Sequence, residues 1–185
     1  MTAKKSGASS AKNDVSIGII LFDSESEYFD EITSGMNDAA EAYSSQKPNI
    51  ITKGIEYSIK AQLLAIDELV KMHIKGLIIT PMDVPEVRSK LAEVMQKGIE
   101  VVTVNSDIED TDRMCYVGPD AYKSGTVAGG LMKILTGDSA EIAIITGSSE
   151  LHGHRERVRG FTETVTKKPS NITIDAVSDC KDDSY

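Results

Sequence analysis

The stretch that decides the fold runs from Gly98 to Gly125 and reads GIEVVTVNSDIEDTDRMCYVGPDAYKSG. It contains two short apolar runs, Glu100–Val104 and Met114–Val117, and each run ends abruptly in small or polar residues. Short apolar runs between turn-forming residues are typical of strands that are buried in a parallel sheet. Ligands of open α/β sheets bind just beyond the carboxyl ends of such strands. The stretch therefore predicts two strands and a polar loop between them that can face a ligand.

Strands alternate with helices along the rest of the chain. The predicted strands are Val15–Phe22, Ile50–Tyr57, Gly76–Thr80, Glu100–Val104, Met114–Val117, Glu141–Ile145 and Ile172–Val177. The predicted helices, which show the three- and four-residue spacing of apolar side chains, are Tyr28–Tyr43, Ile59–His73, Val84–Lys97, Tyr122–Leu135 and His154–Thr166. This alternation predicts βαβ units, and therefore a doubly wound, mainly parallel α/β sheet with helices on both faces.

The same pattern divides the chain into two lobes. Five strands precede Gly118, which is enough for a complete N-terminal lobe over residues 15–118. Residues 119–185 supply two strands and two helices, too few to close a second three-layer lobe, so we expect a partial, truncated C-terminal lobe. Residues 1–14 contain lysines but no apolar segment of the kind found in signal peptides, and we expect a disordered leader or linker there.

Composition excludes several classes of protein. Apolar residues make up 40% and aromatic residues 5% of the 185 residues, which fits an α/β interior of Ile, Val and Ala. The net charge of −9 argues against sequence-independent nucleic-acid binding, which requires a Lys- and Arg-rich surface. No apolar run is long enough to span a membrane. Cys115 lies in a predicted strand, so a buried free thiol is favoured over a disulfide with Cys180, in keeping with a cytoplasmic protein.

The sequence lacks the motifs of catalysis and phosphate binding. It contains no G-x-G-x-x-G after the first strand, no G-x-x-x-x-G-K-[ST], no G-x-S-x-G and no Ser-His-Asp order. His152 and His154 form an H-x-H pair, but no further ligands stand at a recognised metal-site spacing. Asp107 and Asp120 are predicted to be turn and helix-cap residues. We therefore expect no enzyme, no metal and no cofactor, and a Rossmann-like enzyme remains only as a third alternative.

Six segments, in their order and spacing, resemble the type 1 periplasmic-binding-protein fold. They are SIGIILFDSESEYFDEITSGMNDAA, KGLIITPMD, GIEVVTVNSDI, YVGPDAYKSGTVAGGLM, IAIITG and HRERVRGF, and they cover almost all of residues 15–161. Sugar-binding proteins of the ribose type share this fold with the inducer domains of LacI/GalR-type transcriptional regulators. The resemblance implies a monosaccharide-sized ligand between two lobes, with aromatic rings on the sugar face and charged or amide groups on its hydroxyls.

The resemblance also implies seven ligand-binding positions, which are Ser26, Tyr28, Phe29, Thr80, Asn105, Ser106 and Arg157. Tyr28 and Phe29 stand where the family has a pair of aromatic residues after the first strand, and Arg157, in RVRGF, stands at the family's ligand-binding arginine. Two alternatives remain open. The helical spacing of Phe29 also fits a core residue, and Arg157 could instead be a surface partner of Glu156 or Glu163.

One departure from the ribose type guides the functional interpretation. Proteins of that type carry an Asp-Arg pair where this chain has Asn105 and Ser106, and the VNSDI form is more similar to the regulator branch. We therefore interpret the chain as the carbohydrate-binding effector domain of a LacI-type transcriptional regulator, without its DNA-binding headpiece. The expected partners are a sugar, DNA only through that headpiece and, as an option, a second copy in a homodimer. The alternative is a periplasmic or extracellular sugar-binding protein of an ABC transporter.

Overall fold

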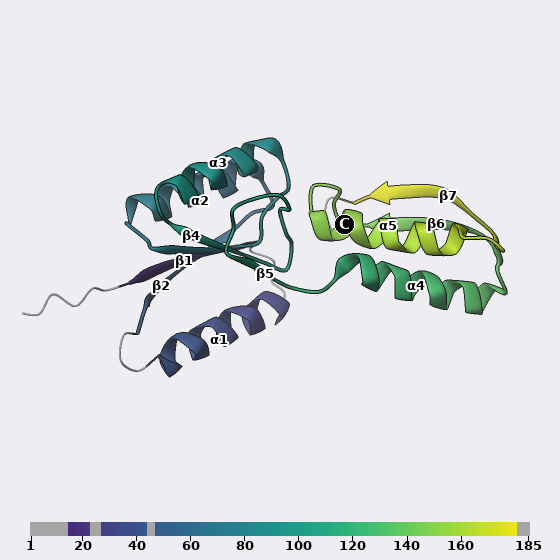
Figure 1. The fold of residues 1–185 in the computed structure, drawn as a ribbon, viewed down its shortest axis with the longest axis horizontal. Coiled ribbons are helices and arrows are strands. Elements are labelled where there is room, and N and C mark those ends of the chain that lie inside the picture. The colour runs from purple at the N-terminus through teal and green to yellow at the C-terminus, as the bar shows by residue number, and fades with distance from the viewer. Residues whose placement is uncertain (1–14, 23–26, 44–46, 181–185) are drawn as a thin grey trace, which may run out of the picture.

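The computed structural model describes residues 15–22, 27–43 and 47–180. They form two α/β lobes that are joined by the segment after Val117, as Figure 1 shows. The predicted leader or linker over residues 1–14 and the predicted ligand-binding residue Ser26 lie outside the described residues.

A five-stranded parallel sheet of order β2-β1-β3-β4-β5 forms the first lobe. Its strands are β1 Ser16–Phe22, β2 Asn49–Ile55, β3 Gly76–Ile79, β4 Glu100–Val104 and β5 Cys115–Val117. Its helices are α1 Glu27–Ala42, α2 Ile59–Lys71 and α3 Pro85–Gln96. Helices α2 and α3 cover one face of the sheet and α1 covers the other (Figure 1). The predicted doubly wound parallel sheet is therefore confirmed.

Both faces of the sheet contribute to the core of the first lobe. Ile20 and Leu77 belong to a large buried cluster with apolar side chains of α2 and α3, including Leu69. Ile19 and Leu21 belong to a smaller cluster, against which side chains of α1 pack. Full burial of one such side chain stabilises a fold by roughly 1.5–3 kcal/mol. The first lobe therefore has an apolar core of its own, on which the loops at the strand ends are supported.

Strand β5 differs from the predicted buried strand. It pairs with β4 alone, at the edge of the sheet, and Cys115 and Val117 are exposed while Tyr116 is partly buried. The prediction that Cys115 is buried is wrong, because burial on both faces holds for the central strands of a parallel sheet and not for a three-residue edge strand. The prediction of a free thiol is confirmed, since Cys115 and Cys180 are both free and exposed.

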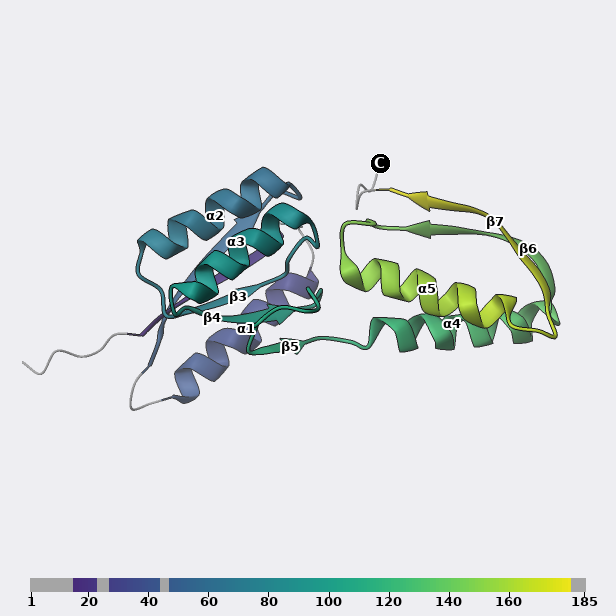
Figure 2. The same cartoon turned by 45° about the horizontal axis from the view of Figure 1, so that its top comes forward.

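The second lobe consists of α4 Ala121–Thr136, β6 Ser139–Thr146, α5 His152–Thr166 and β7 Asn171–Asp179, with β6 and β7 parallel. Figures 1 and 2 both show α4 and α5 side by side, on the same side of the two strands. Glycines allow this close contact. A Cβ atom on Gly125 would lie 2.0 Å from the Arg157 carbonyl oxygen, and one on Gly160 would lie 2.1 Å from that of Tyr122. The two helix backbones therefore touch directly.

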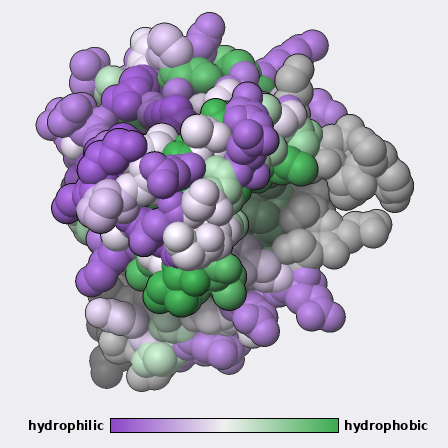
Figure 3. Space-filling view, turned by 90° about the vertical axis from the view of Figure 1, so that its right-hand side faces the viewer, coloured by the Kyte–Doolittle hydropathy of each residue, from purple (hydrophilic) through white to green (hydrophobic). Residues whose placement is uncertain are grey.

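Apolar side chains remain exposed on the second lobe. They lie on α4 and on the two strands, and they are Val127, Leu131, Ile134, Leu135, Ile145 and Val177. Figure 3, which views the molecule from this end, shows apolar side chains gathered at its surface. Exposed apolar surface of this kind marks a face on which another segment or molecule packs. Among the described residues, no helix has both the length and the apolar character that crossing a bilayer requires.

Candidate functional site

The parallel sheet of the first lobe ends its strands at the space between the two lobes (Figure 1). In an open parallel sheet, ligands bind beyond the carboxyl ends of the strands, where the strand order reverses. Here the order reverses at β1, because β2 lies on one side of β1 and β3 on the other. The carboxyl ends of these parallel strands face the second lobe (Figure 1). The loops that follow β3 and β4 therefore lie where ligands of such sheets bind.

Two of the predicted site residues meet there. The hydroxyl group of Tyr28, in the first turn of α1, donates a hydrogen bond of 2.8 Å to Oδ1 of Asn105, which follows β4. Tyr28 is 49% exposed. Because the Asn105 oxygen accepts from the tyrosine, its NH₂ group is the part of the amide that can donate to a ligand. The pair thus presents an aromatic ring and an amide donor, although the two residues are 77 positions apart.

Phe29 lies next to this pair but faces the core. Its side chain is partly buried and packs against both hydrophobic clusters of the first lobe. Ile32 and Met36, one and two turns further along α1, pack against the smaller of the two clusters as well. The ring of Tyr28 meets the ring of Phe29 edge-on, with 5.4 Å between the centroids. This packing favours the core interpretation of Phe29, with Tyr28 as the aromatic residue of the site.

Thr80 and Ser106 are more deeply buried than a ligand contact requires. Their exposed fractions are 1% and 2%. Thr80 directly follows β3, and Ser106 is the second residue after β4. Within the described part of the chain, neither hydroxyl oxygen has a hydrogen-bond partner. A buried hydroxyl group without a partner destabilises the fold, because it has lost its hydration. In this arrangement a ligand reaches Thr80 and Ser106 only if their loops move.

Asp107 organises the loop that follows β4. The residue is 6% exposed, and its carboxylate accepts hydrogen bonds from the Thr103 hydroxyl at 2.7 Å and from the backbone N–H of Ile108 at 2.9 Å. The Arg113 guanidinium forms an ion pair with it at 2.5 Å. A buried carboxylate is stable when it is paired and hydrogen-bonded in this way. Asp107 therefore acts within the loop, which agrees with the turn role that the sequence predicts.

Arg155 reaches across from the second lobe. Its guanidinium forms an ion pair with Asp83, which follows β3 in the first lobe, and its Nη1 donates to the Ser149 carbonyl at 2.8 Å. The Asp83 side chain is 5% exposed and also pairs with Arg88 at 2.7 Å. The backbone N–H of Asp83 donates to the carbonyl of Glu150 at 2.7 Å. Sequence reasoning missed both Arg155 and Asp83, although the segments HRERVRGF and KGLIITPMD contain them.

Arg155 and Arg159 of HRERVRGF lie four positions apart and therefore on nearly the same face of α5, whereas Arg157, two positions from each, lies on the other side of the helix. The predicted ligand-binding residue Arg157 is exposed. Burial raises the pKa of the Tyr116 hydroxyl, and the positive charge of Arg157 partly offsets that rise. Arg159 pairs with Glu156 at 2.5 Å and lies 4.3 Å from the ring centroid of Tyr122. The surface ion pair considered for Arg157 is therefore made by Arg159.

A cavity of about 190 Å³ lies between the lobes. Residues of the first lobe, the connection and the second lobe line it, namely Asp107, Glu109, Tyr116, Pro119, Asp120, Ala121, Tyr122, His152, Gly153 and Glu156. A hydrogen bond from Arg159 lowers the pKa of Glu156, so this carboxylate is ionised at neutral pH. The lining thus contains several carboxylates that accept hydrogen bonds from hydroxyl groups.

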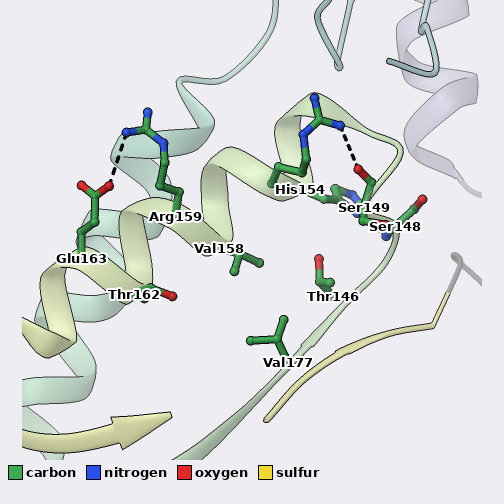
Figure 4. A pocket seen from close by; sticks show the side chains of 10 residues that line it. Thr146, Ser148, Ser149, His154, Val158, Arg159, Thr162, Glu163 and Val177 are labelled. Atoms are coloured by element: carbon green, nitrogen blue, oxygen red, sulfur yellow. Dashed lines mark hydrogen bonds and ion pairs between the residues drawn. The ribbon is translucent and has the colours of Figure 1, made fainter. Parts of the chain in front are cut away.

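A larger cavity of about 400 Å³ lies within the second lobe, between α5 and the two strands. Figure 4 shows Val158 and Thr162 of α5 opposite Thr146 and Val177 of the strands, around the same space. All of its lining residues belong to the second lobe. The interlobe cavity is smaller but combines polar side chains from both lobes, and we regard it as the better candidate for a ligand.

The two histidines of the H-x-H pair have different partners. Nδ1 of His154 accepts a hydrogen bond of 2.8 Å from the backbone N–H of Ser148. Nε2 of His152 lies 3.6 Å from the carboxylate of Glu109 in the first lobe. In the part of the chain that the structure describes, no three His, Cys, Asp or Glu side chains are arranged to hold a metal ion.

Comparisons with known proteins agree with the fold. A family model described as a periplasmic binding protein domain matches residues 17–185. The chain is 24% identical over 170 residues to a xylitol-binding protein of Mycolicibacterium smegmatis. The aligned region covers 91% of this chain and 48% of that protein. The chain therefore spans about half the length of this curated relative.

Solved structures are similar over most of the chain. XylFII superposes with a TM-score of 0.78 at 29% sequence identity, covering 90% of this chain and 60% of that one. GanP, a glucose-galactose binding protein from Geobacillus stearothermophilus, superposes with a TM-score of 0.81 at 26% identity, covering 91% of this chain and 59% of that one. The match of the family model over most of the sequence shows that the chain belongs to the periplasmic binding protein domain family.

Proposed function

We propose that the protein binds a monosaccharide or a sugar alcohol between its two lobes, as the sugar-binding component of an ABC transporter or a sensor outside the cytoplasm. The observation that carries the proposal is the polar cavity between the lobes, with the Tyr28–Asn105 pair beside it. The carbonyl oxygen of Asn105 accepts a hydrogen bond from Tyr116 and lies 3.8 Å from the position of a Cβ atom on Gly153. Tyr116 and Gly153 both line the cavity.

The chemistry of these groups suits a neutral polyol. Sugar hydroxyl groups both donate and accept, so carboxylates such as Glu109 and Glu156 can accept from them while the Asn105 amide donates. The ring of Tyr28 offers an apolar face to the C–H groups of a sugar. The excess of carboxylates at the cavity repels phosphates and other anionic ligands. This charge pattern therefore favours uncharged sugars and sugar alcohols.

Binding between the lobes would act through their relative position. The lobes contact each other through the ion pair of Arg155 with Asp83 and through a hydrogen bond of 2.6 Å from the Tyr57 hydroxyl to Oγ of Ser148. A ligand favours the closed arrangement only if it binds that arrangement more tightly than the open one. A partner protein that recognises the closed arrangement would then detect the bound sugar.

The names of the relatives support sugar binding and favour the transporter or sensor interpretation over the regulator. The similar proteins are described as binding xylitol or glucose and galactose. A LacI-type effector domain in the cytoplasm stays as the second candidate, because the VNSDI segment is more similar to that branch. Fractionation of cells that express the full-length protein separates the two candidates. A protein found outside the cytoplasm supports the first, and a cytoplasmic protein that binds DNA supports the second.

The extent of the second lobe is also part of the proposal. We propose that the exposed apolar side chains of α4 and β6, such as Leu131, Ile134 and Ile145, are covered by further chain of the kind that the longer relatives contain. Residues 119–185 would then be a partial C-terminal lobe, and residues 15–118 the complete N-terminal one.

Titration calorimetry tests the proposed function. The full-length protein is titrated with xylitol, D-glucose, D-galactose and D-arabinose, and at least one of these ligands is expected to give a saturable signal. The Asn105→Ala variant should bind that ligand more weakly, because it lacks the amide donor. The absence of binding to every member of the panel would contradict the proposal.

A further inference from the structure

Asn105 has a backbone conformation that needs support. Its φ angle is 64°, in the left-handed region that L residues other than glycine rarely adopt, although asparagine tolerates it better than most. Two of its groups have partners. The backbone N–H donates to the Val117 carbonyl at 3.0 Å, and Oδ1 accepts from Tyr28. The third group, its carbonyl oxygen, depends on Tyr116.

The hydroxyl group of Tyr116 lies between two carbonyl oxygens. One is that of Asn105 at 3.1 Å and the other is that of Pro119, in the connection between the lobes, at 3.0 Å. A phenol carries one proton, so it donates to one of the two carbonyl groups at a time. Tyr116 therefore joins the loop that carries Asn105 to the segment about which the lobes would rotate.

Gly118 holds the Tyr116 ring in place at this connection. A Cβ atom on Gly118 would lie 2.2 Å from the Tyr116 hydroxyl oxygen and 2.5 Å from the carbon that bears it. The ring thus lies directly against the Gly118 backbone, in space that only glycine leaves open. Burial and the nearby Asp107 carboxylate raise the pKa of the Tyr116 hydroxyl, so the group keeps its proton, and its ability to donate, at neutral pH.

We propose that Tyr116 is a positioning residue of the sugar site, which holds Asn105 in its left-handed conformation and links that conformation to the position of the interlobe connection. Rotation of the lobes moves Pro119 relative to Asn105, and the hydroxyl proton then shifts between their carbonyl groups. The hydrogen bond from Tyr116 to the Asn105 carbonyl oxygen therefore differs between the open and closed arrangements of the lobes. The proposal rests on the proposed function, because it assigns Asn105 to the ligand site.

The Tyr116→Phe variant of the full-length protein tests this proposal, since it removes the hydroxyl group and keeps the ring. Calorimetry with xylitol, D-glucose, D-galactose and D-arabinose should show an affinity about tenfold lower for whichever sugar the unmodified protein binds. The melting temperature should change little. Tyr43→Phe is the matched control, because Tyr43 is 72% exposed, and its affinity should equal that of the unmodified protein.

A second measurement needs no ligand and separates this proposal from the proposed function. In amide hydrogen exchange by NMR, the Asn105 N–H should exchange at least about tenfold faster in Tyr116→Phe than in Tyr43→Phe, because its loop opens more easily. Equal exchange rates in the two variants would overturn the proposal. So would faster exchange with unchanged sugar affinity. Faster exchange in a protein that binds none of the four ligands would overturn both the proposed function and the assignment of Tyr116 to a sugar site.

Discussion

Arg155 of the second lobe forms an ion pair with Asp83 of the first lobe, and Asp83 is buried at the point where the lobes meet. Asp83 also pairs with Arg88 of its own lobe, so a single carboxylate serves a guanidinium group from each side. The backbone hydrogen bond from Asp83 to Glu150 lies at the same place. These contacts hold the lobes together, and any separation of the lobes must break them.

The Asp83→Asn variant should open the lobes. Asparagine has nearly the same shape but lacks the charge that attracts both arginines, so the closed arrangement loses much of its stabilisation. We expect a larger radius of gyration by small-angle scattering and a sugar affinity about tenfold lower, because a smaller fraction of the protein is closed. Asp67→Asn is the control, since Asp67 pairs with Lys90 within the first lobe and its side chain is 46% exposed. Identical scattering from the two variants would contradict the expectation.

Arg155 and Arg157 are the two candidates for the ligand-binding arginine on the second lobe. Arg157→Ala should weaken sugar binding while leaving the melting temperature nearly unchanged, because its side chain is exposed. Arg155→Ala should weaken binding and also open the lobes, because it removes the partner of Asp83 on the second lobe. Lys123→Ala, an exposed cation on α4, serves as the control. Normal binding by Arg157→Ala together with lost binding by Arg155→Ala would show that the resemblance pointed to the wrong arginine.

The hydrogen bond between Tyr28 and Asn105 can be measured by a double-mutant cycle. Tyr28→Phe removes the hydroxyl, Asn105→Ala removes the amide, and the double variant removes both. If the pair acts together in the site, the effects on the free energy of sugar binding should be non-additive by about 1 kcal/mol. Additive effects in calorimetry would mean that the two residues contribute independently, or that one of them lies outside the site.

The glycines between α4 and α5 should be sensitive to substitution. Gly125→Ala and Gly160→Ala each place a methyl group about 2 Å from a carbonyl oxygen of the other helix, which forces the helices apart. Overpacking of this kind destabilises proteins by roughly 1–3 kcal/mol or more, and the midpoint of urea unfolding should fall accordingly.

Gly130 provides the matched control for these two variants. It lies on the same helix as Gly125, and a Cβ atom there would meet nothing within 4 Å. Gly130→Ala should therefore stabilise the protein by about 0.5–1 kcal/mol, because alanine loses less backbone entropy in a helix than glycine. Destabilisation by Gly130→Ala equal to that of Gly125→Ala would show that the close helix contact is not the cause.

Local patterns predicted most of the fold. The predicted strand Glu100–Val104 has the same bounds in the structure, and the predicted cap Asp120 accepts a hydrogen bond of 2.9 Å from the Lys123 N–H at the start of α4. Such features depend on residues close together in the sequence, where apolar periodicity and capping act. The burial of Cys115 was predicted wrongly, because an apolar run does not reveal whether its strand lies in the middle of the sheet or at its edge.

The candidate site was predictable only in part. The resemblance indicated Tyr28 and Asn105, which the fold brings together, but Asp83, Tyr116 and Arg155 carried no signal that set them apart. The sequence by itself determined the element types, their order and the polar loops at the strand ends, because these follow from local periodicity. Only the tertiary structure decided which arginine reaches Asp83 and which hydroxyl supports Asn105, because these contacts depend on helix rotation and on the relative position of two lobes.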